Sequence, residues 1–230
     1  MIYVLWPTAR PEVFINRHYN DWLCKADSYF KTIVVVDSNQ DKQSIRNTKL
    51  KPLKISEDYY QKCEILISDA KTPGVAKPCH LAARHISTKP DDIIILASDD
   101  FSAPPHWDTW IKEQGKDYKG CLWVNDGFKP GGTITIPILT HDCLMSLNRT
   151  IYHPSYNHEW SDAELYDILK ELELLKDLRP APNLIFKHNH WACGDRKQDE
   201  VDLKCRKMHN IDQRNYMLRK HLSIKEKLQS

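Results

Sequence analysis

The sequence has no long hydrophobic run and almost no net charge. No apolar stretch among its 230 residues approaches the roughly 20 residues that cross a bilayer, so no membrane span is expected. The start, from Met1 to Pro7, carries neither a basic leader nor a small-residue cleavage site, so no secretion signal is expected. The 33 basic and 31 acidic residues leave a net charge of +2, which argues against a strongly basic, non-specific nucleic-acid binder.

Glycine is scarce, and cysteine does not occur in the even number of a secreted disulfide scaffold. Seven glycines leave no room for a long flexible linker, and the seven cysteines are scattered. Reduced thiols and a cytoplasmic location are therefore expected. With 41% hydrophobic and 28% charged residues, the chain has the composition of an ordinary globular domain with one core.

Apolar segments alternate with helical segments in the first half. The predicted core strands are Ile2 to Trp6, Thr32 to Val36, Glu64 to Ile67, and Asp92 to Ala97. The predicted helices between them are Pro11 to Ala26 and Val75 to Ile86. This alternation predicts an α/β fold with a mostly parallel central sheet.

The second half changes character. Its predicted elements are a helix from Pro104 to Gln114 and strands from Gly120 to Val124, Thr133 to Leu139 and Asn183 to Phe186. Ser161 with Glu164 three residues later has the pattern of a capping box, for a helix that continues to Leu175. From Glu200 onward the charged tail has helical propensity.

Two groups of metal-binding side chains follow predicted strands. Asp99 and Asp100 follow the strand that ends at Ala97, and His188 and His190 follow a late strand. Adjacent carboxylates repel one another unless a cation or a donor-rich ligand lies between them, and oxygen ligands with imidazole suit Mn²⁺ better than Mg²⁺. The alternatives are an acidic turn for the carboxylates and a solvated loop for the histidines.

Taken in order, these motifs resemble those of glycosyltransferases with the GT-A fold, of the large inverting family-2 type, over residues 1–196. The segments that carry the resemblance are Pro7-Thr8-Ala9-Arg10-Pro11, Asp37, Gly74-Val75-Ala76, Ser98-Asp99-Asp100, Pro104-Pro105 with Trp107, Asp162, and His188-Asn189-His190. The resemblance implies a single Rossmann-like GT-A domain over residues 1–196. Residues 197–230 are then expected to form a helical C-terminal extension packed on that domain.

The resemblance also assigns roles to individual residues. It implies that the nucleotide sugar, a UDP-sugar in many members, is bound by Pro7, Thr8, Arg10, Asp37 and Asp99. The chain departs from the family pattern in having Ser98 as the first residue of the Asp-x-Asp motif and Cys79-His80 where an Asn is usual. These departures concern the identity of the donor more than the class of reaction.

The metal and the catalytic base follow from the same resemblance. Asp100 with His188 or His190 would hold Mn²⁺ (or Mg²⁺) on the diphosphate, where the ion neutralises the charge of the leaving group. Asp162 would take the proton of the acceptor hydroxyl, with inversion at the sugar. The alternative for Asp162 is an early-helix acid that the helix dipole favours.

The acceptor is predicted less directly. Trp160, Trp191 and Tyr156 could form an aromatic platform, although ordinary core packing explains each equally well. The short chain and its His-x-His ending also resemble small glycosyltransferases encoded by phages, which would act in the host cytoplasm. That suggests a hydroxymethylated pyrimidine in double-stranded DNA as acceptor, with phosphates contacted by the basic side chains of the tail: Lys204, Arg206, Lys207, Arg214, Arg219 and Lys220.

Three other interpretations stay open, and a fourth is disfavoured. His190, Cys193, Cys205 and His209 have spacings like those of a structural Zn²⁺ site. The chain could be a cell-surface polysaccharide glycosyltransferase, or a catalytically silent module that binds nucleotide sugars. A nucleotidyltransferase is disfavoured, because the turn after the first strand lacks the glycines of a phosphate loop.

Overall fold

The main sheet is mostly parallel, as the sequence predicted. The computed structural model describes residues 1–36, 43, 63–68, 74–128, 133–191, 194 and 197–229. Within these ranges, seven strands form a sheet in the order β3-β2-β1-β4-β7-β6-β8. They are β1 (Ile2–Thr8), β2 (Lys31–Val36), β3 (Cys63–Ile67), β4 (Ile93–Leu96), β6 (Cys121–Trp123), β7 (Ile138–Thr140) and β8 (Leu175–Asp177). Only β7 runs against its two neighbours, β4 and β6.

A second, small sheet lies beside the first. It pairs β5 (Phe101–Ser102) with β9 (Lys187–His188) in antiparallel register, with Phe101 opposite His188. The helices with described bounds are α1 (Pro11–Arg17), α4 (Ala76–His85), α5 (Trp107–Gly115), α6 (His141–Ser146), α7 (Ser161–Glu171), α8 (Glu200–Arg206), α9 (His209–Arg219) and α10 (Ile224–Lys227).

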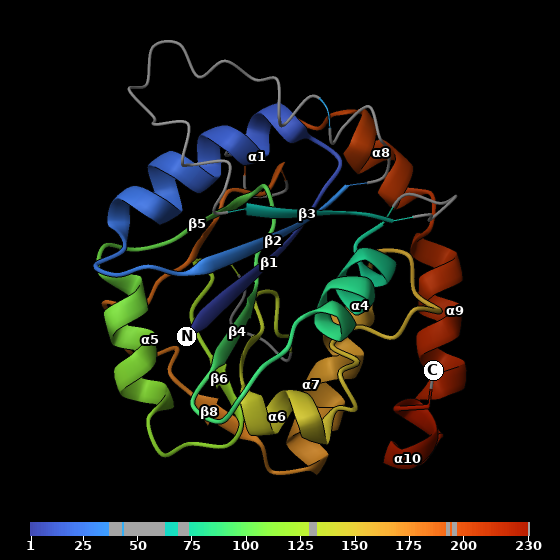
Figure 1. Ribbon diagram of the computed structural model, residues 1–230. Helices are drawn as coiled ribbons and strands as arrows, with labels where there is room; N and C mark the ends of the chain where they lie inside the picture. Colours follow the sequence, from blue (N-terminus) through green and yellow to red (C-terminus); the bar gives the residue numbers. More distant parts are fainter. Residues whose placement is uncertain are drawn as a thin grey trace.

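Helices cover both faces of the main sheet (Figure 1). α1 and α5 pack on one face, whereas α4, α6 and α7 pack on the other. Because the strands are buried on both sides, β2 and β4 are continuous runs of aliphatic residues rather than alternating ones.

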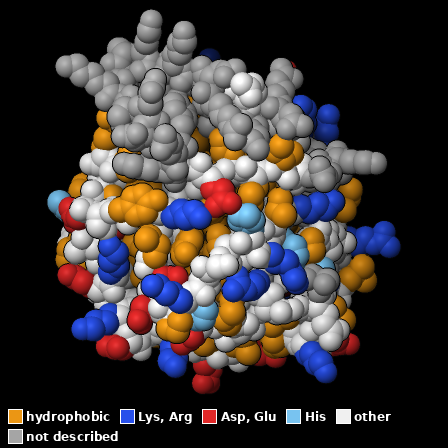
Figure 2. Space-filling view, viewed as in Figure 1, with side chains coloured by type: hydrophobic (Ala, Val, Ile, Leu, Met, Phe, Trp, Pro, Cys, Tyr) orange, Lys and Arg blue, Asp and Glu red, His pale blue; other side chains and the backbone are white. Residues whose placement is uncertain are grey.

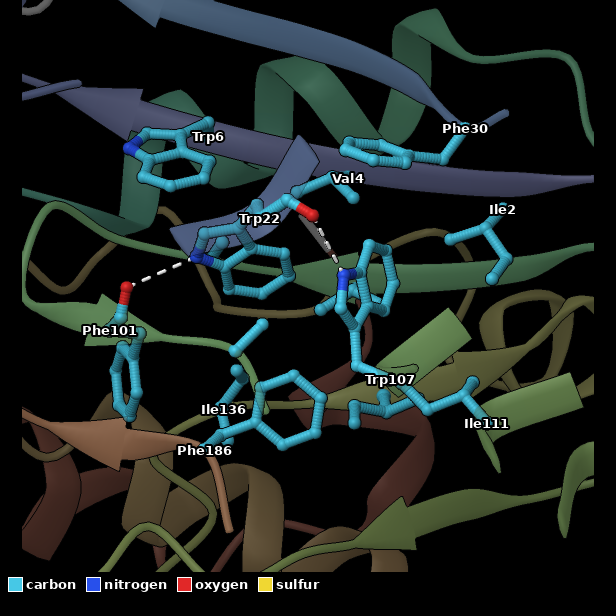
Figure 3. Packing of buried hydrophobic residues seen from close by; sticks show 14 of the residues in the cluster. Ile2, Val4, Trp6, Trp22, Phe30, Phe101, Trp107, Ile111, Ile136 and Phe186 are labelled. Carbon is cyan, nitrogen blue, oxygen red and sulfur yellow. Dashed lines mark hydrogen bonds between the residues drawn. The ribbon is translucent and has the colours of Figure 1, made fainter. Parts of the chain in front are cut away.

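Three fully buried tryptophans dominate the core under α1 and α5. Figure 3 shows Trp22 and Trp107 packed with Phe30 and Phe186. The two indole rings of Trp22 and Trp107 meet edge to face, with centroids 5.2 Å apart. The indole N–H of Trp22 donates to the carbonyl of Phe101 at 3.1 Å, and that of Trp107 donates to the carbonyl of Trp22 at 3.0 Å. The third, Trp6, donates to Asp99 at 2.9 Å, so each buried indole N–H has an acceptor.

Several predicted element bounds were wrong. The helix expected to reach Leu175 ends at Glu171, because Glu173 adopts a φ of 56° and Leu175 begins β8. The strand expected over Asn183 to Phe186 lies instead at β9, Lys187–His188. In the expected range only Ile185 forms a β-bridge, to Asn125.

The first predicted helix and one predicted strand also differ. After α1 the backbone continues as a π-helical turn (His18–Trp22) and a 3₁₀ turn (Leu23–Lys25), instead of one α-helix from Pro11 to Ala26. Of the strand predicted over residues 133–139, only its last residues belong to β7.

Several polar contacts join the C-terminal helices to the rest of the chain. In α8 and at its N-cap, Asp202 and Asp199 bind Arg10. In α9, Asp212 and Arg219 bind the loop before α7 and α7 itself. α9 also lies against α7 (Figure 1).

The surface mixes charges of both signs, in line with the small net charge. Figure 2 shows Lys and Arg side chains interspersed with Asp and Glu over the described part of one face. None of the described helices has the length and apolarity required of a bilayer span.

Candidate active site

A cavity of about 500 Å³ opens at the carboxyl ends of β1 and β4. Parallel strands of an open α/β sheet deliver their ends to such a crevice. The site residues predicted from sequence that line it are Pro7, Thr8, Arg10, Asp99, Asp100, Trp160, Asp162, His188, His190 and Trp191. Of the other predicted site residues, Asp37 lies outside the described residues.

The small sheet brings His188 against Asp100. Asp100 directly precedes β5, and its backbone carbonyl accepts the N–H of Asn189, which follows β9, at 2.6 Å. Nε2 of His188 then lies 3.2 Å from Oδ2 of Asp100, and its ring stacks on Phe101 with centroids 4.3 Å apart. His190 is close by, with its ring centroid 5.0 Å from that of His188.

The two adjacent carboxylates have opposite environments. Burial raises the pKa of Asp99 to about 7, although its oxygens accept hydrogen bonds from Trp6 at 2.9 Å and Thr8 at 2.8 Å. Burial also acts to raise the pKa of Asp100, but the hydrogen bonds of His188 and Ser98 and the electrostatic effect of His188 and His190 together outweigh it, so this pKa is lowered. The carboxylate of Asp100 therefore favours the ionised form, and it is partly accessible. Asp99 is buried, and its hydrogen bonds to β1 join the end of β4 to that strand.

Arg10 connects the site to the C-terminal extension. Its guanidinium donates to both carboxylate oxygens of Asp199, at 2.7 and 2.9 Å, and to Asp202 at 3.0 Å. It also lies 3.8 Å from Asp99. Burial acts to lower the pKa of Arg10, but Asp199 and the other carboxylates raise it, so the side chain is a fixed cation. A nucleotide phosphate at Arg10 would share it with these carboxylates.

Asp162 lies in the first turn of α7, at the cavity wall. It is partly exposed, and its Oδ1 accepts the N–H of Ala163 at 2.9 Å. The predicted capping box was wrong: Trp160 is the N-cap, with φ 66°, and Ser161 is the first helical residue. Glu164 is buried instead, where Arg219 binds it at 2.9 Å.

The predicted aromatic platform is only partly available. Tyr156 is fully buried and belongs to the core, which is the core-packing alternative that the sequence left open for it. Trp160 lines the cavity and stacks on Tyr216 with centroids 5.2 Å apart. Trp191 also lines the cavity, with the guanidinium of Arg206 5.7 Å from its ring centroid.

The donor set at Asp100 fits a hard divalent ion that a diphosphate helps to bind. Within the described ranges, no three His, Cys, Asp or Glu side chains are grouped so that they could hold a metal alone. An ionised carboxylate with one imidazole is nevertheless a suitable pair for Mn²⁺ when phosphate oxygens and water supply the remaining ligands. Asp100 and His188 provide such a pair, 3.2 Å apart.

The predicted zinc site does not assemble from its described members. His190, Cys205 and His209 form no group that could hold a metal, and Cys193 lies outside the described residues. The imidazole Nδ1 of His209 is instead bonded to Glu159, and burial raises the pKa of the Cys205 thiol to about 11.

Sequence reasoning missed a buried carboxylate behind His188. Oδ2 of Asp126 is 4.0 Å from Nδ1 of His188, on the other side of the ring from Asp100, which is an ion-pair separation rather than a hydrogen bond. An Asn-Asp-Gly turn straight after an apolar strand was a signal for it. Glu159, Asp202 and His209 line the cavity. Nothing in the local sequence marks Asp202, whereas His209 was expected as a zinc ligand.

Comparisons with known proteins show the fold. No protein-family model and no curated protein matches the chain. Among solved structures, S. aureus TarS 1-349 in complex with UDP is 13% identical with a TM-score of 0.56, over 98% of this chain and 76% of that one. Glucosyl-3-phosphoglycerate synthase from Mycobacterium tuberculosis, in complex with Mn²⁺, UDP and glucosyl-3-phosphoglycerate, is 12% identical with a TM-score of 0.54, over 88% and 74%.

A nucleotidyltransferase is also similar. A putative glucose-1-phosphate thymidylyltransferase from Bacillus anthracis is 8% identical with a TM-score of 0.53, over 90% of this chain and 96% of that one. At these identities the likeness concerns architecture alone. The chain has the GT-A-like fold that the sequence motifs indicated.

Proposed function

From this GT-A-like fold, we propose that the protein is a metal-dependent glycosyltransferase. It moves a sugar from a nucleoside-diphosphate sugar, most simply a UDP-sugar, to an acceptor hydroxyl. The observation that carries the proposal is the carboxylate of Asp100 held 3.2 Å from His188 near the carboxyl end of β4, where both line the cavity. Two solved structures of similar fold hold UDP, and one of them also holds Mn²⁺.

Each residue at this site has a proposed role in the reaction. Asp100 and His188 would hold the ion on the diphosphate, with the carboxylate of Asp126 behind the imidazole, 4.0 Å from its Nδ1. When bound, a divalent ion neutralises the negative charge that develops on the leaving diphosphate. Asp162 would accept the proton of the attacking hydroxyl, and attack from the face opposite the leaving group would invert the anomeric centre.

A screen of the full chain against several nucleotide sugars, read by mass spectrometry with and without Mn²⁺, tests this function. We expect hydrolysis or transfer of one donor, with Mn²⁺ at least as effective as Mg²⁺, because the donor set includes imidazole. Asp100→Ala should abolish Mn²⁺-dependent UDP binding together with turnover. Asp142→Ala, at an exposed carboxylate of α6, is the matched control and should change neither.

Two results would refute the metal assignment. One is full turnover in excess chelator. The other is an Asp100→Ala variant that binds UDP with unchanged affinity and unchanged metal dependence. Pyrophosphate-dependent release of a sugar 1-phosphate would instead indicate a nucleotidyltransferase. Mn²⁺-dependent UDP binding without any donor turnover would indicate a silent binding module.

For the acceptor, the proposal retains a hydroxymethylated pyrimidine in DNA. It is supported by exposed basic side chains on and beside α8 and α9: Lys204, Arg206, Lys207, Arg214 and Lys220. Arg219 drops out of this set, because it is bound to Glu164. If these residues contact phosphates, DNA binding should weaken steeply with salt, and transfer should require the base hydroxyl. Transfer to a polysaccharide but not to hydroxymethylated DNA would identify the cell-surface alternative.

A further inference from the structure

Asp212 of α9 is a fully buried carboxylate that binds the loop in front of α7. Its Oδ1 accepts the backbone N–H of Asn157 and the side-chain amide of Asn157, both at 2.9 Å. Its Oδ2 accepts the N–H of His158 at 2.8 Å and that of Glu159 at 3.0 Å. Three consecutive backbone N–H groups and one amide thus converge on a carboxylate with no exposed surface.

The loop held in this way carries part of the cavity wall. His158, Glu159 and Trp160 line the cavity, and Asp162 follows two residues later. Trp160 adopts φ 66°, a left-handed conformation that a bulky residue occupies only when its surroundings impose it. The carbonyl of Trp160 accepts the N–H of Glu164 at 3.0 Å, so the loop conformation also fixes where α7 begins.

The same loop is also held by the start of α4. The N–H of Ala76 donates to the carbonyl of Asn157 at 3.3 Å, at the start of α4. Gly74 allows this approach, because a Cβ there would lie 1.9 Å from the same carbonyl oxygen. Asn157 is therefore fixed between α4 and Asp212.

We propose that Asp212 is a positioning residue for the transfer reaction, which makes the C-terminal extension a working part of the site. Through Asn157 and its two neighbours, Asp212 sets the conformation of Trp160 and the start of α7, and hence the place of Asp162. This inference rests on the proposed function. It predicts that loss of Asp212 impairs transfer from bound donor, while Asp100 and His188, on other elements, still bind Mn²⁺ and UDP.

Asp108 offers a matched control elsewhere in the fold. It is also a fully buried aspartate in the first turn of a helix, α5. It accepts the backbone N–H of Asp27 at 2.8 Å and that of Ser28 at 2.9 Å, from a loop that does not line the cavity. Asp108→Asn therefore measures how much stability and turnover change when any buried carboxylate that binds a loop is lost.

The experiment compares Asp212→Asn with Asp108→Asn in the full chain. For each we would measure the melting temperature, Mn²⁺-dependent UDP binding, donor turnover per folded molecule, and the indole N–H resonance of Trp160 by NMR. We expect both variants to melt earlier and to bind Mn²⁺ and UDP with nearly normal affinity. Only Asp212→Asn should shift the Trp160 resonance and lower turnover at least about tenfold, since a displacement of about 1 Å can cost about 10²-fold.

Other outcomes decide against the proposal. It fails if the two variants lose turnover equally, or if the Trp160 resonance is unmoved in Asp212→Asn. If the wild type turns over no donor at all, the proposed function fails, and the Trp160 resonance still decides whether Asp212 sets this wall. Should Asp212→Asn not fold, Asn157→Ala replaces it, because it removes only the side-chain amide donor and should give the same effects in weaker form.

Discussion

At the scale of single residues, Asp162 is the group on which the proposed proton transfer depends. We expect Asp162→Asn to lower turnover by about 10²–10⁴-fold, the usual loss for a general base, with Mn²⁺ and UDP binding retained. Its melting temperature should change little, because asparagine can accept the same Ala163 N–H. Kinetics, UDP titration and thermal melts of this variant and of Glu171→Gln, an exposed acid at the other end of α7, test the point. A lower melting temperature with intact turnover would make Asp162 a structural residue.

A second residue, His18, makes stability depend on pH. Its ring is buried among Trp6, Phe14 and Phe30, and Nε2 lies 2.6 Å from the hydroxyl of Thr32. Burial lowers the pKa of His18 from its ordinary value of 6.5 to about 3. Below pH 6.5 this histidine is therefore protonated in the unfolded chain but stays neutral in the folded chain. The free energy of unfolding falls as the pH is lowered from 6.5 towards 3.

The His18 contribution can be isolated by comparison with a variant. Between these two pKa values, His18 alone should lower the free energy of unfolding by about 1.4 kcal/mol for each unit by which the pH is decreased. Urea titrations at several pH values should show a shallower dependence for His18→Gln than for the wild type. His221→Gln, at an exposed position near the C-terminus, is the control and should keep the wild-type slope. Parallel slopes for all three proteins would contradict the assignment.

Sequence patterns anticipated some of these residues and misled on others. Asp100 and His188 were expected to meet at the ends of neighbouring parallel strands, but the antiparallel pair of β5 and β9 brings them together instead. The pattern could not show that Asp99 turns inward to Trp6 and Thr8, since both acids follow the same strand. It misread Glu164 as a capping residue, because its partner Arg219 is 55 residues away.

At the scale of elements, one buried ion pair joins α7 to α9. The side chain of Glu164 is 4% exposed and that of Arg219 is 12% exposed, with Nε and Oε1 2.9 Å apart. Burial raises the pKa of Glu164, and Arg219 offsets part of this effect. Arg219→Gln should cost about 3–5 kcal/mol of unfolding free energy at neutral pH, because it leaves a buried carboxylate unpaired.

The unfolding free energy that Arg219→Gln loses should grow as the pH rises. A raised pKa means that the folded state favours the neutral acid, so the penalty for an unpaired Glu164 appears as the pH rises through this pKa. Arg219→Gln should therefore be closer to the wild type in acid than at neutral pH. Arg214→Gln, on the exposed side of the same helix, should differ little from the wild type at either pH. An equal loss for both variants in urea titrations would refute the role of the pair.

Element prediction succeeded where periodicity was long and failed where it was short. The aliphatic runs of β1, β2 and β4 were sufficient to predict the parallel sheet. The two-residue strands β5 and β9 carry no periodicity of their own, yet they place His188 beside Asp100. Strand β8 was hidden, because its leucine extended the apolar pattern of the preceding helix.

At the scale of the whole molecule, the extension is coupled to the domain by polar contacts as well as by the packing of Tyr216, Ile224 and Leu228 on the core. Arg10 binds Asp199 and Asp202 near one end, and Glu164 binds Arg219 near the other. Such long-range pairs leave no local signal in a sequence. The charged tail could therefore be predicted to be helical, but not to line the cavity.

Because these ties hold it at several points, we expect the extension to unfold together with the domain rather than before it. Amides of α9 should then exchange hydrogen with the same opening free energy as those of α7, since both belong to one cooperative unit. A double variant, Arg10→Gln with Arg219→Gln, removes both outer ties and should make α9 exchange faster than β1 and β4. Lys204→Gln with Arg214→Gln removes two exposed charges from the extension without cutting a tie, and should leave the exchange pattern unchanged. If α9 of the wild type exchanges much faster than α7, the extension opens independently. The cavity wall that it contributes would then be intermittent.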